Sequence, residues 1–575
     1  MTGKDFCHSA LSSCLRFLEE HFPIPGLLKS GDLETGDRLK SRQLIFGLIF
    51  LITWLRINPE PLNHKVLKRI INIILFFFAT PVSHAQNRPN ILFIPVDDLR
   101  PEAGAYGNPN IRTPNIDRIA KQGVVFLRAY CQQAVCNPSR ASLLTGLRPD
   151  SLRVWDLQTD FRKNLPAVET LPQYFRQNGY TTVGIGKTYH NIFPDSASWT
   201  RELHVDGYPF DPDAVYASAA QLAIQEEKKK KFIADGNTSR IDRYGLWYLK
   251  AGATENADVP DDAYYDGAQT TMAIAELGRL TKEGNPFFLS VGYYRPHLPF
   301  NAPRKYWDLY DKNKLPLASN QFIPKGSPDF AVHGDRELRS YDDFHDLPLP
   351  GQGILPEDRQ RELIHGYYAS ISYIDAQIGR LLDKLDQLGL SKNTIIVLWG
   401  DHGWKLGEHN SWAKQSNYEI DTRVPLIVGG AGVKAKGKAT KSLTEFVDIY
   451  PTLCEMAGLP VPTMLQGTSF APLLKKPDTP WKQAAFSQFL LGRFPRGSQP
   501  EKMGYAIRTD RYRYVEWYTW VDDKPVELLA RELFDHTRDP KENINLAAIK
   551  GYESIVEQHA LGLKAGWRAA QTAQK

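Results

Sequence analysis

The chain has 575 residues, of which 42% are hydrophobic and 11% aromatic, which is ordinary for a globular protein with two or three cores. Its formal net charge of +5 is small for this length, and no run of Lys and Arg resembles a nucleic-acid-binding arm. We therefore expect no nucleic-acid partner, and any attraction to an acidic substrate must come from a local cluster of basic residues.

The first 85 residues are predicted to be a leader region that carries no catalytic signal. A basic pair, an apolar run over 70–80 and small residues up to Ala85 form the three zones of a secretory signal peptide. A second apolar run, 44–55, is shorter than the ~20 residues that span a bilayer. We expect a periplasmic or secreted protein without a stable membrane partner, translated from a non-Met codon near Val66. The alternative is a real N-terminal extension with a membrane anchor.

Residues 86–455 alternate between apolar runs and helix-like patterns. Strands are predicted at 91–96, 124–126, 180–185, 286–293 and 394–399, and the first of them has the apolar run of a strand buried on both faces. Helices are predicted at 114–122, from Cys136 onward, at 358–388, where apolar residues recur at three- and four-residue steps, and at 447–457. Strands that alternate with helices predict an α/β catalytic domain with a mostly parallel central sheet sandwiched by helices.

Carboxylates follow two of the predicted strands. Asp97 and Asp98 come directly after the first strand, and Asp401 and His402 come after the strand at 394–399. Ligands of such sheets bind beyond the carboxyl ends of the strands. Carboxylate oxygens suit Ca²⁺ or Mg²⁺ better than Zn²⁺. The sequence therefore predicts a site for a divalent cation at this edge of the sheet.

The segment from Cys136 to Arg140 reads Cys-Asn-Pro-Ser-Arg and begins a predicted helix. Pro138 fits the first helical turn, where its missing N–H is not needed. Cys136 is thus expected at the helix N-terminus, which favours an anion, with Arg140 adding a positive charge one turn later. An ordinary buried cysteine beside a helix cap is the simpler alternative. We expect no structural disulfide, and Cys454 fits a small core residue.

Two later segments differ from the catalytic pattern. Residues 316–352 are rich in Pro, Gly and Asp, and a long irregular loop in a compact domain is usually functional, so this loop is predicted to roof the substrate pocket. Residues 456–575 are predicted to form a smaller α+β subdomain. Its expected elements are strands at 503–508, 512–515 and 532–535 and a closing helix at 552–570.

The Cys136 motif and its Leu-Leu-Thr-Gly tail resemble the signature of type I sulfatases, in which this cysteine is oxidised to formylglycine. Further motifs resemble the iduronate-2-sulfatase branch of that family, in colinear order from about residue 89 to 548. They include Asp97-Asp98-Leu-Arg-Pro, Gly186-Lys187-Thr-Tyr-His190, Tyr-Tyr-Arg-Pro-His297, Asp401-His402-Gly-Trp and Trp-Ala-Lys414. His402 agrees with this branch, whereas Tyr294 replaces a shorter side chain expected before the basic residue of its motif.

The resemblance implies an alkaline-phosphatase-like fold, a sulfated sugar substrate and a formylglycine-generating enzyme as the partner during maturation. It implies that one Ca²⁺, with Mg²⁺ as the alternative, is held by Asp97, Asp98, residue 136, Asp401 and His402. The implied roles are nucleophile for Cys136 as formylglycine hydrate, sulfate neutralisation for Arg140, Lys187 and Lys414, general acid for His297 or Lys414, and general base for His190.

Three functions remain open at this point. The first is hydrolysis of a sulfate ester on a sulfated sugar, with the 2-O-sulfate of iduronate favoured and Arg295 as the partner of the uronate carboxylate. Tyr294 and the loop at 316–352 could instead shape the pocket for another sulfated polysaccharide. The second is a phosphonate or phosphodiester hydrolase of the same superfamily. The third is a sulfated-glycan binder without activity, against which the intact Cys136 and ligand set argue.

Overall fold

A computed structural model of the chain describes residues 88–190, 193–205, 216–236, 250–332, 335–492 and 501–571. The predicted leader of residues 1–85 lies outside these ranges. Among the described helices, none is both long and apolar enough to cross a membrane. The unit formed from Arg88 onward is built on a large central sheet and a smaller C-terminal sheet.

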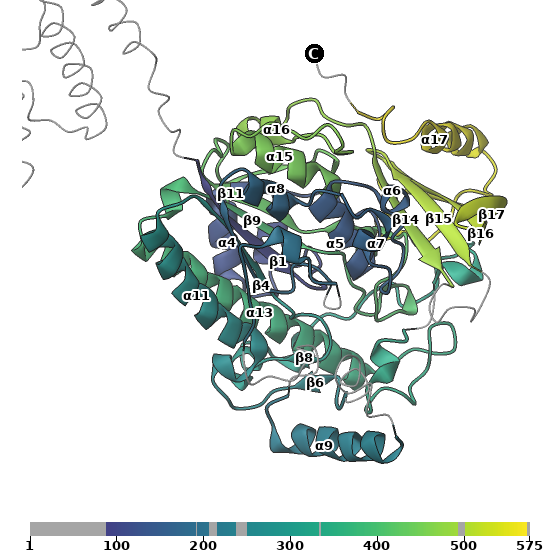
Figure 1. Cartoon of the computed structure of the whole chain (residues 1–575). Coiled ribbons are helices and arrows are strands. Elements are labelled where there is room, and N and C mark those ends of the chain that lie inside the picture. The colour runs from purple at the N-terminus through teal and green to yellow at the C-terminus, as the bar shows by residue number, and fades with distance from the viewer. Residues whose placement is uncertain are drawn as a thin grey trace, which may run out of the picture. The chain divides into compact units, whose positions relative to one another are not determined.

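The central sheet has eight strands, and most neighbouring strands are parallel (Figure 1). Their order is β12 (Lys438–Thr440), β2 (Gly123–Phe126), β11 (Leu426–Gly430), β9 (Thr394–Gly400), β1 (Asn90–Val96), β7 (Phe287–Gly292), β4 (Thr181–Gly186) and β5 (Arg201–Leu203). Strand β11 departs from the predicted parallel pattern because it runs antiparallel to both β9 and β2. The register of β1 with β9 places Val96 opposite Gly400, so both strands end at the same edge.

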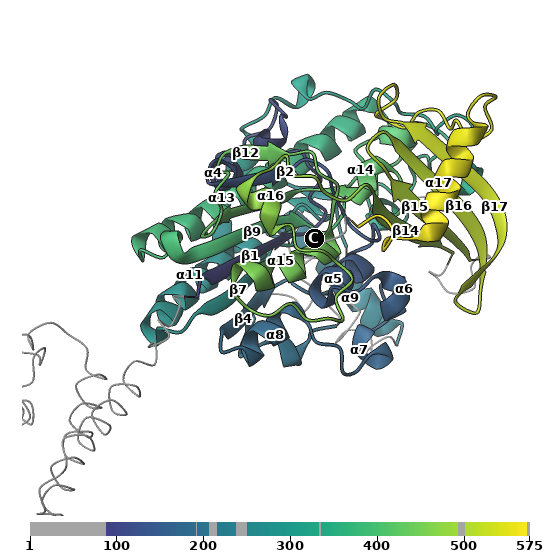
Figure 2. The same cartoon turned by 90° about the horizontal axis from the view of Figure 1, so that it is seen from above.

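Helices cover both faces of this sheet, as predicted (Figures 1 and 2). One face carries α4 (Pro114–Lys121), α11 (Tyr265–Glu283) and α13 (Glu357–Gln387). The other face carries α5 (Cys136–Thr145), α8 (Leu171–Gln177), α15 (Ile449–Met456) and α16 (Ala471–Lys475). The strands β1 and β9 are buried along their whole length, which explains why their sequences are almost continuously apolar.

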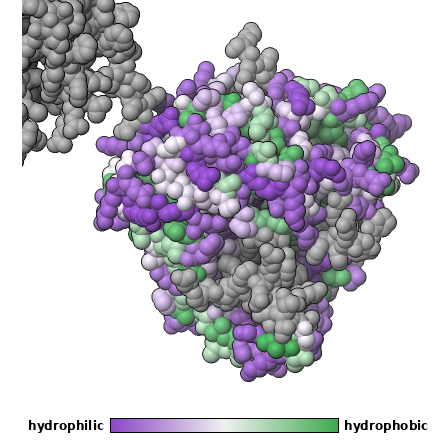
Figure 3. Space-filling view, in the orientation of Figure 1, coloured by the Kyte–Doolittle hydropathy of each residue, from purple (hydrophilic) through white to green (hydrophobic). Residues whose placement is uncertain are grey.

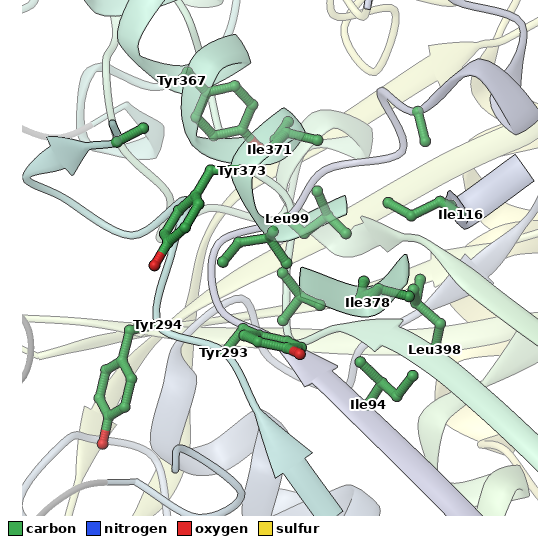
Figure 4. Close-up of a cluster of buried hydrophobic side chains, with 14 of the residues drawn as sticks. Ile94, Leu99, Ile116, Tyr293, Tyr294, Tyr367, Ile371, Tyr373, Ile378 and Leu398 are labelled. Atoms are coloured by element: carbon green, nitrogen blue, oxygen red, sulfur yellow. The ribbon is translucent and has the colours of Figure 1, made fainter. Parts of the chain in front are cut away.

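The long helix α13 is fixed to the sheet by an apolar stripe. Ile378 of this helix lies next to Ile94 of β1 and Leu398 of β9, and Ile371 lies next to Leu99, all within one buried cluster (Figure 4). Each such side chain contributes about 1.5–3 kcal/mol when it leaves water. This packing holds the ends of β1 and β9, and the residues that follow them, in a fixed position.

The C-terminal subdomain is an antiparallel sheet with one helix against it. Its strands are β14 (Ala485–Leu491), β15 (Lys502–Arg508), β16 (Tyr512–Val521) and β17 (Lys524–Asp535), and its helix is α17 (Glu553–Ala565). The sequence did not predict β14, and it placed the start of β17 eight residues too late. The first six residues of β17 are exposed, so they lack the apolar alternation that marks a strand.

The remaining elements are short, apart from one exposed helix. They are β3 (Ala129–Tyr130), β10 (Arg423–Val424), β13 (Thr444–Glu445), β6 (Thr254–Glu255), β8 (Phe300–Asn301), α6 (Pro149–Leu152), α7 (Phe161–Asn164), α9 (Ala219–Ala234), α12 (Arg304–Trp307) and α14 (Glu419–Thr422). The three described cysteines, Cys131, Cys136 and Cys454, are buried free thiols. On the described part of the face in Figure 3, hydrophobic residues form small groups within a mainly hydrophilic surface.

Candidate active site

The carboxylates that follow β1 and β9 lie side by side at one edge of the central sheet. Asp97, Asp98 and Asp401 are all fully buried. The backbone turns at Asp98, whose φ is 57°. The amide of Asp98 donates a hydrogen bond to Oδ1 of Asp401 at 3.0 Å, and the amide of His402 donates to the same oxygen at 3.1 Å. Strand register therefore brings together the metal ligands that the sequence predicts.

Helix α5 presents its first residue, Cys136, to these carboxylates. The sulfur of Cys136 lies 3.2 Å from Nε2 of His402. Ser139, in the first turn, donates from Oγ to the carbonyl oxygen of Asp401 at 2.5 Å, which ties the helix to the end of β9. Burial raises the pKa of the Cys136 thiol well above its usual value and outweighs the nearby positive charges. As a thiol, this residue is therefore a poor nucleophile near neutral pH.

Two basic residues neutralise the carboxylates beside the helix. Arg140 reaches Oδ1 of Asp97 at 2.8 Å and Oδ2 of Asp401 at 2.9 Å, and none of these side chains is exposed. Lys187, which follows β4, lies 2.5 Å from Oδ2 of Asp97. Burial alone would raise the pKa of Asp97, but Lys187 and Arg140 outweigh it and hold that pKa well below its ordinary value.

Lys414 lies in the loop that follows β9 and forms an ion pair with Asp98, the second of the two carboxylates that follow β1. Its Nζ lies 2.8 and 2.9 Å from the two oxygens of Asp98. Burial alone would lower the pKa of Lys414, but Asp98 and its neighbours raise it well above the usual value. The lysine is thus held as a cation within the buried site.

The donor set fits a divalent cation. Single ligand atoms of Asp97, Cys136 and Asp401 lie within 4.8 Å of one another, and so do those of Asp98, Cys136 and His402. A buried cluster with three carboxylates suits Ca²⁺ or Mg²⁺, which prefer oxygen ligands. In this structure the basic side chains described above balance the charges of these carboxylates.

One carboxylate at the site belongs to none of the motifs. Glu337 lies in the loop at 316–352, and its Oε1 is 2.8 Å from Nε2 of His297. Its Oε2 is 3.2 Å from Nζ of Lys414. Burial would raise the pKa of Glu337, but Lys414 and His297 hold it well below the ordinary value. The sequence pointed to this loop through its composition, but it offered no signal for this residue.

Other predicted residues lie in the loops after β4 and β7. His190 is half-buried, and its ring centroid is 6.3 Å from that of Phe193. Arg295 is buried and donates from Nη1 to the carbonyl oxygen of His297. Its amide donates to Oδ2 of Asp266 at 3.0 Å, so it supports the turn that carries His297. A pairing of Arg295 with a uronate carboxylate stays a prediction.

The structure therefore brings most of the predicted site residues into one buried cluster. Contacts between side chains link Asp97, Asp98, Cys136, Arg140, Lys187, Asp401, His402 and Lys414. His297 joins this cluster through Glu337. His190 and Lys187 both lie in the segment that follows the end of β4.

Comparison with protein families gives two matches. The family described as sulfatase matches residues 89–459. The family described as N-sulphoglucosamine sulphohydrolase, C-terminal, matches residues 407–566.

Individual relatives agree with these matches. The chain is 35% identical to iduronate 2-sulfatase of Mus musculus and 34% identical to that of Homo sapiens, over 81% of this chain and 92% of each relative. Among solved structures, a phosphonate monoester hydrolase of Agrobacterium radiobacter is similar, with a TM-score of 0.64 and 22% identity over 83% of this chain and 95% of that one. At this identity the likeness concerns the fold alone.

Proposed function

The chain belongs to the sulfatase family and is a sulfuric ester hydrolase, and we propose that it removes the 2-O-sulfate of a terminal iduronate from glycosaminoglycan-type or related fragments. The observation that carries the proposal is the convergence of Cys136 with three buried carboxylates at the carboxyl ends of β1 and β9. Three buried basic side chains surround them and suit an anionic sulfate.

We propose that residue 136 acts as formylglycine, made by a formylglycine-generating enzyme. The buried thiol has a raised pKa and is a poor nucleophile, whereas a hydrated aldehyde offers two hydroxyl groups at the same position. Two hydroxyls matter because one can attack sulfur, while ionisation of the other allows the aldehyde to reform as sulfate leaves. A serine at this position would instead remain trapped as its sulfate ester.

A divalent cation would be held by Asp97, Asp98, Asp401, His402 and residue 136, and we propose Ca²⁺, with Mg²⁺ as the alternative. When bound, the cation supplies positive charge that activates the attacking hydroxyl. The carboxylates are already oriented for this role by β1 and β9 and by the amides of Asp98 and His402.

The basic residues perform the remaining chemistry in this proposal. Arg140, Lys187 and Lys414 neutralise the sulfate oxygens and the charge that develops in the transition state. His297 or Lys414 donates a proton to the sugar oxygen as the bond between sulfur and that oxygen breaks. His190 takes up a proton from residue 136 in the step that releases sulfate.

The choice of sugar is supported by the relatives and by the residues beside the site. Both relatives named above are iduronate 2-sulfatases. Tyr294, which departs from the motif of that branch, is buried with its ring centroid 5.5 Å from Nζ of Lys187. Tyr294 and the loop at 316–352 are the features through which the pocket would instead accept a different sulfated polysaccharide. We propose a periplasmic or secreted location, where such polymers occur.

A panel of defined oligosaccharides tests this proposal. The chain, produced with a formylglycine-generating enzyme, is assayed for sulfate release from iduronate, glucuronate and neutral sugars sulfated at different positions, and for cleavage of phosphonate monoesters and phosphodiesters. We expect the fastest turnover on 2-O-sulfated iduronate. Faster turnover of a neutral sulfated sugar would refute the iduronate assignment alone. Cleavage of phosphonates or phosphodiesters without sulfate release would refute the proposed reaction.

A further inference from the structure

Glu337 bridges two of the basic residues at the active site. Its two oxygens are used separately, Oε1 toward His297 at 2.8 Å and Oε2 toward Lys414 at 3.2 Å. Its side chain is 19% exposed, whereas the side chains of His297 and Lys414 are 9% and 4% exposed. The carboxylate therefore lies at the outer side of this pair, between the buried site and solvent.

The loop that carries Glu337 is fastened to the segment that carries Lys414. Asp335, two residues earlier, is fully buried and accepts hydrogen bonds from Oγ of Ser411 at 2.7 Å and from the amide of Trp412 at 2.9 Å. Leu338, on the other side of Glu337, is buried in the main core. These contacts on both sides hold Glu337 at a fixed place against the site.

The bridge determines how both basic side chains are oriented. Lys414 lies between two carboxylates, Asp98 at 2.8 Å and Glu337 at 3.2 Å. The ring of His297 lies between the carbonyl oxygen of Leu298, 2.7 Å from Nδ1, and the carboxylate of Glu337 at Nε2. Without Glu337, each side chain would keep its inner partner but lose the outer one. Lys414 and His297 are the two candidates for the proton donor in the proposed reaction.

We propose that Glu337 is a positioning residue that holds His297 and Lys414 in the geometry in which they face the leaving oxygen of the sulfate ester. The inference rests on the proposed sulfatase reaction and deepens it, because it assigns a role to a loop residue outside the motifs. A displacement of about 1 Å in such groups lowers turnover about 10²-fold. The loss falls mainly on kcat, since His297 and Lys414 act on the leaving oxygen. Two of the three cations proposed to neutralise the sulfate, Arg140 and Lys187, make no contact with Glu337 and keep their positions.

Three substitutions at one position test this role. In Glu337→Ala both contacts are lost, and in Glu337→Gln the amide nitrogen faces one of the two donors, so one contact is lost. We expect kcat for sulfate release to fall about 10²-fold in both, with a KM within about threefold of the wild type. Glu337→Asp keeps the charge on a shorter side chain and is expected to restore part of kcat. Asp346→Asn, a change of the same charge at an 85% exposed position in the same loop, should leave kcat unchanged.

Thermal unfolding of each variant separates positioning from a loss of structure. If kcat falls only in proportion to the folded fraction at the assay temperature, or is unchanged, the positioning role is wrong. If Glu337→Ala raises kcat, the carboxylate obstructs the site, and the role is also wrong. A wild-type protein that carries formylglycine and releases no sulfate from any sugar would refute the proposed function itself. The two failures are thus distinguishable.

Discussion

The carboxyl ends of β1 and β9 and the loop at 316–352 both supply charged side chains to one site, but they hold them differently. At the strand ends, Asp97, Asp98 and Asp401 are fully buried and are placed by sheet register and by the helices that cover the sheet. In the loop, Glu337 is partly exposed and is held by a few polar contacts of its neighbour Asp335. The rigid region is suited to chemistry common to a family, and the loop to adjustment of that chemistry to one substrate.

The largest expected effect comes from breaking the strand-end region. Asp97→Ala or Asp401→Ala should abolish sulfate release, because the cation loses a ligand and Arg140 loses a partner. The measurement is turnover after chelation and again after addition of Ca²⁺ or Mg²⁺. Wild-type activity should return with the metal, whereas activity of the variants should not. Full activity in either variant would contradict the proposed ligand set.

The next effect concerns the stability of the same region. In the metal-free protein, Arg140→Leu leaves Asp97 and Asp401 buried without their shared partner, which should lower the free energy of unfolding by about 3–5 kcal/mol. Arg118→Leu is the matched control, since Arg118 pairs with exposed Asp383 and should change the free energy of unfolding by about 1 kcal/mol or less. Urea denaturation measures both. If both variants changed the free energy of unfolding equally, the buried ion pairs of Arg140 would contribute no more to stability than the exposed ion pair of Arg118.

The smallest expected effect is a pH dependence of stability that comes from one buried carboxyl group of the loop, Asp335. Burial raises the pKa of Asp335 to about 6, above the ~3.9 expected for the unfolded chain. The folded state therefore binds the proton of Asp335 more tightly than the unfolded chain does. Protonated Asp335 thus adds to the free energy of unfolding, and this contribution, at most about 3 kcal/mol, is lost as pH rises from about 4 to about 6. The pKa values of Asp97 and of Glu337 are lowered in the folded state, so the stability that these two carboxylates contribute is lost as pH falls.

Asp335→Asn removes this titrating group and leaves Glu337 in place. The difference in free energy of unfolding between wild type and variant, measured by urea denaturation at pH 4 and pH 7, should decrease at the higher pH. A difference that does not vary with pH would show that Asp335 titrates as in the unfolded chain.

The sequence predicted the strand-end region because its signals are local. The apolar runs before Asp97 and Asp401 and the Pro138 turn after Cys136 each mark an element whose end presents a functional residue. The α/β fold, the helices on both faces and the C-terminal subdomain were confirmed, but the strands β5, β11, β12 and β14 were not predicted, and β11 runs antiparallel to its neighbours. These additions depend on pairing with strands far away in the sequence, which no local pattern encodes.

Glu337 could not be predicted from the sequence for a different reason. Its contacts join residues about 40 and 77 positions away, and the loop between 316 and 352 has no period that would fix the direction of a side chain. The described residues of the loop, 316–332 and 335–352, form two short 3-10 turns, Asp329–Ala331 and Leu338–Ser340, and otherwise irregular backbone. Long-range polar contacts, rather than propensity, place this residue.

The most direct test of the central claim is the mass of the peptide that contains Cys136. Trypsin cleavage after Arg128 and Arg140 releases residues 129–140, which also contain Cys131 as an internal control. In a preparation that releases sulfate, we predict a peptide about 18 Da lighter than the dithiol form, with fragment ions that place the change at residue 136 and leave Cys131 a thiol. An active preparation in which residue 136 is an unmodified thiol would contradict the proposed nucleophile.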